Sequence, residues 1–223
     1  LKNTPAFYKK QYPWLKEVDS LALANVQLHL ERAYQNFFRN PQSGFPKFKS
    51  KHRSRASYTT NVVNGNIKLE EGKLKLPKMS HVKLVQHRQI PKEYQLKSVT
   101  VTQEPSGKYY ASLLYTYESQ ISEEKEAVEK MLGMDFAMSG MAVFSDGSRA
   151  EYPMYYRKSE KKLCKEQRKL SHCVKGSRNH EKQRRKVAVC HEKVKNQRKD
   201  FQHKLSRKLA DSYDAVCVED LNM

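Results

Sequence analysis

Apolar residues near the start of the chain recur at the spacing of a helix. Within "LALANVQLHLERAYQNFF" (21–38) they lie three or four positions apart, which is the period of one helix face. Asp19 or Ser20 is suited to cap the start of this helix, and the Pro and Gly of "RNPQSG" mark its end. The pattern therefore predicts a helix that begins near residue 20 and ends near residue 40.

Between residues 56 and 118 the helical period gives way to alternation. β-Branched and apolar residues alternate with polar ones, and glycine-containing turns separate the runs. Asn64-Gly65 is a strong hairpin signal, and "EPSGK" (104–108) predicts a second hairpin. We therefore expect several short antiparallel strands that form a small β-barrel, an architecture that often binds nucleic acid. A purely scaffolding β-domain is the alternative.

After residue 130 the chain alternates again and then becomes helical. "MLGMDFAMSGMAVFSDGSRAEY" (131–152) predicts an antiparallel meander of three strands, with Asp135 near the end of the first. Two helices are predicted within residues 157–208, and a last short strand, "AVCV", precedes Glu219. The acidic run "ESQISEEKEAVEK" (118–130) is interpreted as a linker between this part and the β region.

The charge of the chain indicates a polyanionic partner. The 223 residues have a formal net charge of +19, and residues 157–208 hold 20 Lys and Arg but 5 Asp and Glu. Such an excess usually neutralises nucleic acid, with an anionic membrane as the alternative. No apolar run approaches the roughly 20 residues that span a bilayer, and "LKNTPAFYKK" lacks the apolar core of a secretory signal. We therefore expect a cytoplasmic protein with no membrane partner.

Two basic segments are candidate nucleic-acid-binding sites. In "GFPKFKSKHRSRASY" (44–58), cations alternate with rings that suit base stacking, although Phe45 and Phe48 are alternatively core anchors. The second segment comprises the two basic helices within residues 157–208, whose alternative role is a solvated charged face. The candidate residues are Lys47, Lys49, Lys51, Arg53, Arg55, Lys182, Arg184, Arg185, Lys186, Lys195 and Arg198.

His172, Cys173, Cys190 and His191 are four side chains of the types that bind zinc, on neighbouring predicted helices. Cys164, Cys173, Cys190 and Cys217 are widely and irregularly spaced, which fits reduced intracellular thiols better than disulfides. Cys173 and Cys190 each adjoin a histidine, but the usual CxxC or HxxxH spacing of a zinc site is absent. These thiols are therefore interpreted as small core residues, and no zinc site is expected in this chain.

Two predicted strands end in an acid, at Asp135 and Glu219. Hydrolysis of a phosphodiester by the two-metal route needs carboxylates from different strands that converge on Mg²⁺ ions. Acids at strand ends are also common as turn formers and helix caps, so the spacing leaves both interpretations open.

At these residues the sequence resembles the OrfB/TnpB family of proteins, which bacterial insertion sequences encode. Members of this family are RNA-guided DNA nucleases related to type V CRISPR effectors. The resemblance covers nearly the whole chain, with its runs in the family's order. They include "YPWLKEVDSLAL", "AYQNFFRNPQSGFPKFKSKHRS", "KLPKMSHVKLVQHRQIP", "SVTVTQEPSGKYYASLLYTYE", "LGMDFAMSG", "YRKSEKKLCKEQRKL" and "VCVEDLNM".

The resemblance implies an α+β fold with four regions. They are a helical recognition-type segment and basic loop (1–55), a wedge-like β-barrel (56–118), a linker (119–130) and a partial RNase H-like (RuvC) nuclease domain (131–223) with a long basic helical hairpin. It also implies guide RNA and target DNA as partners, a bacterial cytoplasmic location, and Asp135 and Glu219 as catalytic residues and Mg²⁺ ligands.

The family's third acid and its four-cysteine zinc ribbon lie beyond the position of Glu219. We therefore expect zinc only in a region outside this chain, and we expect these 223 residues to be catalytically inactive by themselves. Ala137 stands where many members have glycine, a small change. The alternative function is a non-catalytic RNA- or DNA-binding accessory or regulatory protein of an insertion sequence.

Overall fold

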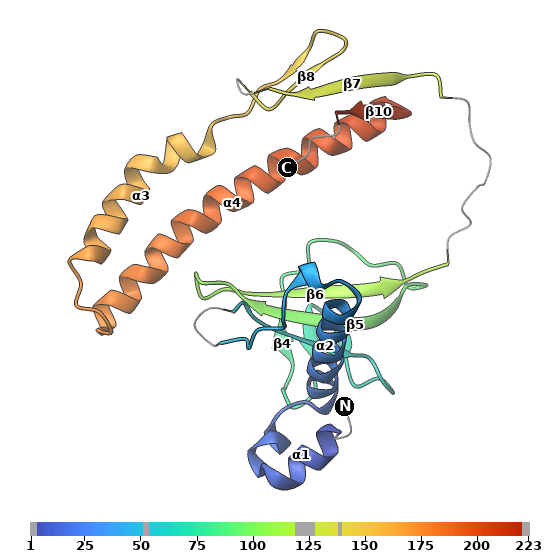
Figure 1. Ribbon diagram of the computed structural model, residues 1–223, viewed down its shortest axis with the longest axis vertical. Coiled ribbons are helices and arrows are strands. Elements are labelled where there is room, and N and C mark those ends of the chain that lie inside the picture. Colours follow the sequence, from blue (N-terminus) through green and yellow to red (C-terminus); the bar gives the residue numbers. More distant parts are fainter. Residues whose placement is uncertain (1–3, 51–53, 119–127, 138–139, 220–223) are drawn as a thin grey trace. The chain divides into compact units, whose positions relative to one another are not determined.

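The computed structural model describes residues 4–50, 54–118, 128–137 and 140–219. The chain divides into two compact units, residues 1–120 and 121–223. Figure 1 shows the helices and strands of both units and labels most of them. Helices and small sheets occur in the same chain, which confirms the α+β class. The four region boundaries expected from the sequence stay a prediction, and most of the expected linker lies outside the described residues.

Unit 1 begins with helices. The short helix α1 (Pro5–Gln11) and the 3₁₀ helix η1 (Pro13–Glu17) precede α2 (Ser20–Arg39), which a 3₁₀ turn, η2 (Pro41–Ser43), follows. Asp19 caps α2 as predicted, because its Oδ1 accepts a hydrogen bond of 3.1 Å from the backbone N–H of Leu21. Proline cannot donate a helical hydrogen bond, so the helix ends before Pro41.

The β region of unit 1 consists of two antiparallel sheets. One has the order β1-β5-β6, with β1 at Ala56–Asn61, β5 at Gln95–Gln103 and β6 at Tyr109–Thr116. The other has the order β2-β3-β4, with β2 at Lys68–Glu70, β3 at Lys73–Lys75 and β4 at Val82–Lys83. Ile67, Leu74, Leu76 and Val99 form their common core. The expected closed barrel is not confirmed, because hydrogen bonds join the described strands into two separate sheets.

The hairpin predicted at Asn64-Gly65 is wrong. Both residues adopt positive φ and form a turn, but β1 pairs with β5 and β2 pairs with β3. The turn therefore leads the chain from one sheet to the other. The hairpin predicted at "EPSGK" is confirmed, since β5 pairs antiparallel with β6 across it.

Unit 2 contains a four-stranded sheet and two long helices. The predicted meander is confirmed as β7 (Met131–Phe136), β8 (Ala142–Phe144) and β9 (Arg149–Ala150). Helices α3 (Tyr155–Ser171) and α4 (Arg178–Ser212) follow, and β10 (Ala215–Val218) then pairs parallel with β7, which gives the order β10-β7-β8-β9. Figure 1 shows the C-terminal end of α4 beside this sheet.

The core of unit 2 lies between the sheet and α4. Leu132, Ala142, Phe144 and Ala150 are buried, and Leu205, Leu209 and Tyr213 from the end of α4 and the segment after it pack against them. Tyr152 and Phe201 extend this contact, with ring centroids 5.6 Å apart. One face of the sheet is therefore covered by apolar side chains of the α4 region.

Candidate functional site

The register of the sheet brings Asp135 and Glu219 side by side. Val218, the last residue of β10, is the partner of Met134 in β7, and Asp135 and Glu219 are the residues that follow them. Extending a parallel register by one residue therefore places the two carboxylates at the same level, on strands that lie about 4.8 Å apart. The structure brings together the two acids that the sequence singled out.

The two carboxylates lie on the face of the sheet opposite α4. Side chains alternate along a strand, and Leu132 and Met134 belong to the core that packs against Leu205 and Leu209. The intervening Asp135 therefore projects to the other face, where it is exposed, and Glu219 is exposed beside it. We call this side of the sheet the carboxylate face.

Two further polar side chains that the sequence did not single out share the carboxylate face. Asp135 is paired with Val143 in β8, and Val143 is paired with Arg149 in β9, so the exposed Arg149 lies in the same row as the acids, two strands from Asp135. In the next row, Ser145 Oγ accepts a hydrogen bond of 2.9 Å from Gly133 N. The alternation of "MAVFSDGSRA" around its Asp-Gly turn was the signal that could have placed Arg149 beside the acids.

A carboxylate at the start of β10 fixes the position of that strand against β7. Asp214 Oδ2 accepts hydrogen bonds from the backbone N–H groups of Lys130 (2.9 Å) and Glu129 (3.2 Å). These hydrogen bonds hold the pKa of the Asp214 carboxyl below its usual value, and the bond from Lys130 has the larger effect. Asp214 therefore stabilises, in its charged form, the register that aligns the two acids at the other end of the strands.

A second carboxylate supports the turn between β8 and β9. Asp146 Oδ1 accepts a hydrogen bond of 2.8 Å from Ser148 N, and Tyr213 Oη donates to Asp146 Oδ2 over 3.3 Å. The bonds from Ser148 are the main cause that lowers the pKa of Asp146. Burial, and then the charge of Asp146, raises the pKa of Tyr213. The turn is thereby tied to the end of α4.

The donor set on the carboxylate face suits a hard cation. Two exposed carboxylates at one level of neighbouring strands offer oxygen ligands, and Mg²⁺ is commonly bound by one or two carboxylates together with water and substrate phosphates. Among the described residues, no group of three or more His, Cys, Asp or Glu side chains is close enough to hold a metal ion. A magnesium ion at this face would be held by Asp135 and Glu219, and its other ligands would come from water and substrate phosphates.

The basic loop of unit 1 is only partly available for nucleic acid. Lys47 and Lys49 are exposed, and Phe48 is fully exposed. Phe45 is also exposed, at 61%, although its ring centroid lies 5.4 Å from that of Phe37 in α2. Arg55 lies 3.4 Å from Glu104, and Lys51 and Arg53 lie outside the described residues.

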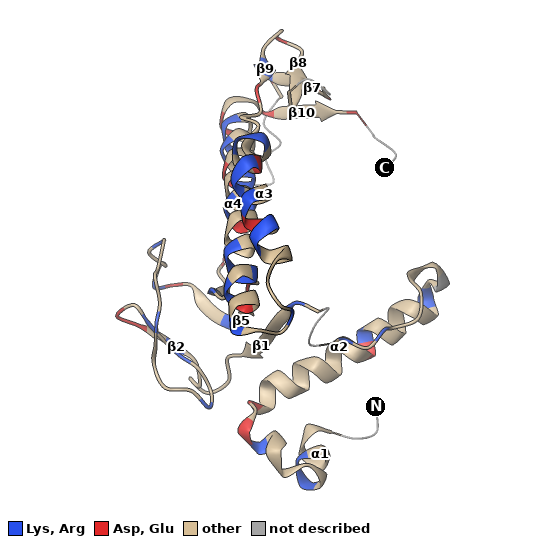
Figure 2. Ribbon diagram, turned by 90° about the vertical axis from the view of Figure 1, so that its left-hand side faces the viewer, with Lys and Arg blue, Asp and Glu red and all other residues tan. Residues whose placement is uncertain are grey.

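The candidate cations of α4 fall into two groups. Lys182, Arg185, Lys186, Lys195 and Arg198 are exposed. Arg184, also exposed, donates to Glu181 Oε2 from Nε (3.2 Å) and Nη2 (2.9 Å), and this bond is the main cause that lowers the pKa of Glu181. Figure 2 shows Lys and Arg recurring along both α3 and α4.

The cysteines lie singly in the structure. Cys164 in α3, Cys190 in α4 and Cys173 in the turn between these helices are half-buried, and Cys217 is exposed on β10. Cys173 Sγ donates to the backbone oxygen of Lys169 over 3.2 Å. No helix in the described ranges has the length and apolar character needed to cross a bilayer.

Comparisons with known proteins place these observations in a family. The OrfB_IS605 family, described as "Probable transposase", matches residues 112–223. The chain is 34% identical over 210 residues to the "Putative RNA-guided DNA endonuclease InsQ" of Escherichia coli (strain K12), an alignment that covers 94% of this chain and 50% of that protein. It is 33% identical over 217 residues to a "Putative RNA-guided DNA endonuclease" of Streptomyces pristinaespiralis, with 96% and 52% covered.

The chain therefore spans about half the length of these curated relatives. The family match begins in β6 and includes both carboxylates and both basic helices. The resemblance inferred from the sequence is thus confirmed, and the chain belongs to the OrfB_IS605 transposase family.

Proposed function

We propose that this chain contributes two catalytic carboxylates and a nucleic-acid-binding surface to a transposon-encoded, RNA-guided DNA endonuclease. The single observation that supports this most strongly is the register that aligns Asp135 with Glu219 on the exposed face of the sheet. The relatives that match over most of this chain are named as RNA-guided DNA endonucleases. Guide RNA and target DNA are accordingly the proposed partners.

We further propose that unit 2 is an RNase H-like (RuvC) domain. A parallel pair of strands, β7 and β10, joined through two helices, supports this assignment, because each strand presents an acid at its carboxyl end. The apolar contact with α4 covers the other face of the sheet. Substrate therefore reaches the acids from the carboxylate face.

Asp135 and Glu219 would hold Mg²⁺ through their carboxylate oxygens. When bound there, Mg²⁺ would supply positive charge that offsets the charge of the phosphodiester and would make a water molecule more nucleophilic. The side chains themselves fix the position of the reacting phosphate between two strand ends. Arg149, in the same row and about 10 Å from Asp135 by strand spacing, binds a neighbouring phosphate with its planar guanidinium group.

Mn²⁺ binding tests the carboxylate pair without requiring cleavage. In a paramagnetic titration of the 223-residue chain, Asp135→Asn and Glu219→Gln are each expected to weaken Mn²⁺ binding at least about tenfold, because each removes a charged ligand. Glu160→Gln, which removes an exposed carboxylate on α3, outside the sheet, serves as the matched control and should leave the affinity unchanged. Equal affinities in all four proteins would favour the non-catalytic nucleic-acid-binding function.

Cleavage tests what two carboxylates can do. The 223 residues alone, with guide RNA and Mg²⁺, are expected to leave plasmid DNA largely intact, because two-metal hydrolysis requires more ligands than Asp135 and Glu219 supply. Efficient cutting by this chain would contradict that expectation. For Arg149, the Arg149→Gln variant should weaken duplex binding in Ca²⁺ more than Arg149→Lys, and equal binding by both variants and the parent would exclude a phosphate contact.

A further inference from the structure

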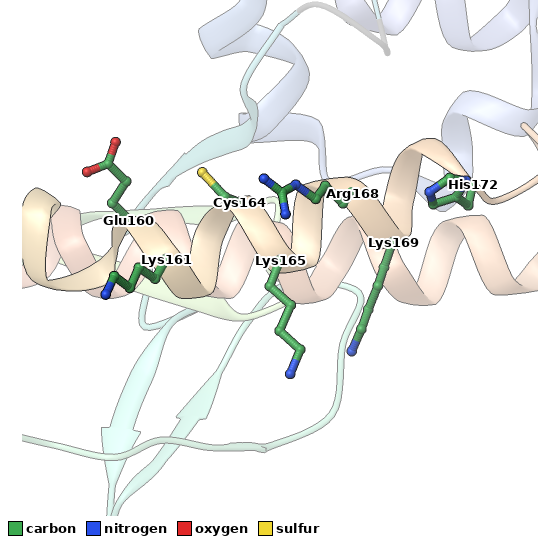
Figure 3. A pocket seen from close by; sticks show the side chains of 7 residues that line it. All are labelled: Glu160, Lys161, Cys164, Lys165, Arg168, Lys169 and His172. Atoms are coloured by element: carbon green, nitrogen blue, oxygen red, sulfur yellow. The ribbon is translucent and has the colours of Figure 1, made fainter.

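Helix α3 presents a cationic face whose individual residues the sequence analysis did not name. Glu160, Lys161, Cys164, Lys165, Arg168, Lys169 and His172 line an open pocket along this helix. In Figure 3, Lys161, Lys165 and Lys169 extend to one side of the helix. Lys161, Lys165 and Arg168 follow one another at intervals of four and three residues. These three cations therefore share one face of the helix and span about 10 Å along its axis.

The packing of α3 turns this face away from α4. Gln183 of α4 donates to the Glu166 backbone oxygen (3.0 Å) and to Glu166 Oε2 (2.6 Å). Leu163 and Leu170, one turn to either side of Glu166, are buried and half-buried. These contacts fix the opposite side of α3 against α4, so Lys161, Lys165 and Arg168 project outward and are exposed.

The three cations differ from Arg184, Lys204 and Arg207 of α4 in their ion pairing. On α4, Arg184, Lys204 and Arg207 lie 2.9, 2.8 and 2.9 Å from Glu181, Asp200 and Asp211. Within the described ranges, Lys161, Lys165 and Arg168 have no carboxylate within salt-bridge distance, whereas the neighbouring Lys169 lies 3.6 Å from Glu166. A cation without an internal partner gives up no existing bond when it contacts a phosphate, so it contributes more to binding a polyanion.

The composition of this face favours a duplex over an unpaired strand. Proteins that bind single strands combine cations with aromatic side chains on which bases stack. The residues that line this face include no Phe, Tyr or Trp. A duplex keeps its bases stacked internally and presents about one phosphate charge per 1.7 Å of axis, so a row of about 10 Å faces several phosphates.

We propose that Lys161, Lys165 and Arg168 form a contact surface for the phosphate backbone of double-stranded DNA. This inference rests on the proposed function, in which DNA is the substrate. It adds that the duplex is held by the outer face of α3 more than by the ion-paired cations of α4. The contact is independent of sequence and of divalent metal.

The test measures how duplex binding depends on salt. The 223-residue chain is titrated against a fluorescent DNA duplex by anisotropy, in EDTA and at several salt concentrations. K161Q/K165Q/R168Q is expected to lower the slope of log affinity against log salt by about 2.7, from about 0.9 for each lost phosphate contact. R184Q/K204Q/R207Q removes the same charge from ion-paired positions and is expected to change the slope by less than about 1.

The outcomes separate this inference from the proposed function. K161R/K165R/R168K keeps the charges and should keep the parent slope, which guards against a folding defect in the Gln variant. Equal slope changes in the two Gln variants would overturn the proposed α3 surface. Because EDTA removes divalent metal, that result would leave the proposal for the carboxylate pair untouched. If the parent chain binds a single strand as tightly as the duplex, and K161Q/K165Q/R168Q lowers the salt slope equally for both, the inference that the ligand is a duplex is overturned. If the parent chain shows no salt-dependent binding to DNA, both the α3 surface and the proposed nucleic-acid-binding function are overturned.

Discussion

Each unit packs a helix against a sheet, but the two contacts differ in chemistry. In unit 1 the contact between α2 and β1 is polar: Thr60 Oγ1 donates to Asp19 Oδ2, and Asn25 Nδ2 donates to the Thr59 backbone oxygen over 2.9 Å. In unit 2, Leu205 and Leu209 pack against a cluster of buried apolar side chains of the sheet. Directional bonds therefore position α2, whereas burial of apolar surface positions α4.

The difference explains where the candidate site lies. Apolar contacts are non-directional. The end of α4 therefore packs on one face of the sheet without requiring polar side chains on that face. The other face keeps Asp135, Glu219 and Arg149 exposed. In unit 1 the buried polar side chains Asn25, Thr60 and Thr102 are used within the fold. Among the described residues, the side chains of Asp135, Glu219 and Arg149 have no hydrogen bond or ion pair that ties them into the fold, which makes this row the better candidate for chemistry.

The largest expected effect comes from the apolar contact of unit 2. Leu132 is 2% exposed at its centre, and Leu132→Ala should lower the free energy of unfolding of unit 2 by about 2–5 kcal/mol through lost burial and a cavity. Hydrogen exchange resolved by peptide measures this, with faster exchange in β7 and α4 and none of the change in β5. Val216→Ala, on the partly exposed edge strand, is the control, and an equal loss there would contradict the assignment of the core.

The polar contact of unit 1 should respond less strongly. Thr60 is fully buried, and Thr60→Val removes its hydroxyl at constant shape, which leaves Asp19 without that donor and should cost about 1–3 kcal/mol. Trp14 is the single tryptophan and lies in η1, so urea unfolding followed by its fluorescence reports unit 1. Thr116→Val, at an exposed position of β6, should change stability by less than about 0.5 kcal/mol. Similar losses in the two variants would show that the Asp19 contact is not the cause.

The local elements of both units were predictable from the sequence, because their signals are local. Asp19 and Pro41 delimit α2, and an Asp-Gly turn separates β8 from β9. Strand pairing was less predictable: Asn64-Gly65 fixes a turn, but β1 pairs with β5 and β2 pairs with β3, so the turn alone does not choose the partner strand. The alignment of Asp135 with Glu219 depends on a parallel register between segments that two helices separate, which no local pattern specifies.

A smaller, pH-dependent effect should come from Asp214, which ties β10 to β7. Its folded-state pKa is lowered, so its contribution is present above the ordinary value of 3.8 and is lost as the pH falls toward the lowered value. Asp214→Asn keeps an oxygen acceptor and loses the charge, so acid unfolding followed by circular dichroism should become less steep in this range. Glu151→Gln removes an exposed charge elsewhere in unit 2, and a matching change in its acid curve would assign the effect to net charge.

The smallest expected effect on stability comes from changing one methyl group on each face of the unit 2 sheet. A Cβ on Gly133, on the carboxylate face, would lie 3.3 Å from Ser145 Cβ, so Gly133→Ala requires a small shift of Ser145 while it restricts the unfolded chain. These effects oppose each other, and the free energy of unfolding should change by less than about 0.5 kcal/mol. Ala142→Gly, which removes a methyl from the core face of β8, should cost about 1 kcal/mol. Thermal unfolding of the two variants measures the difference, and a larger loss for Gly133→Ala would mean that the carboxylate face is packed as tightly as the core and is closed to a substrate.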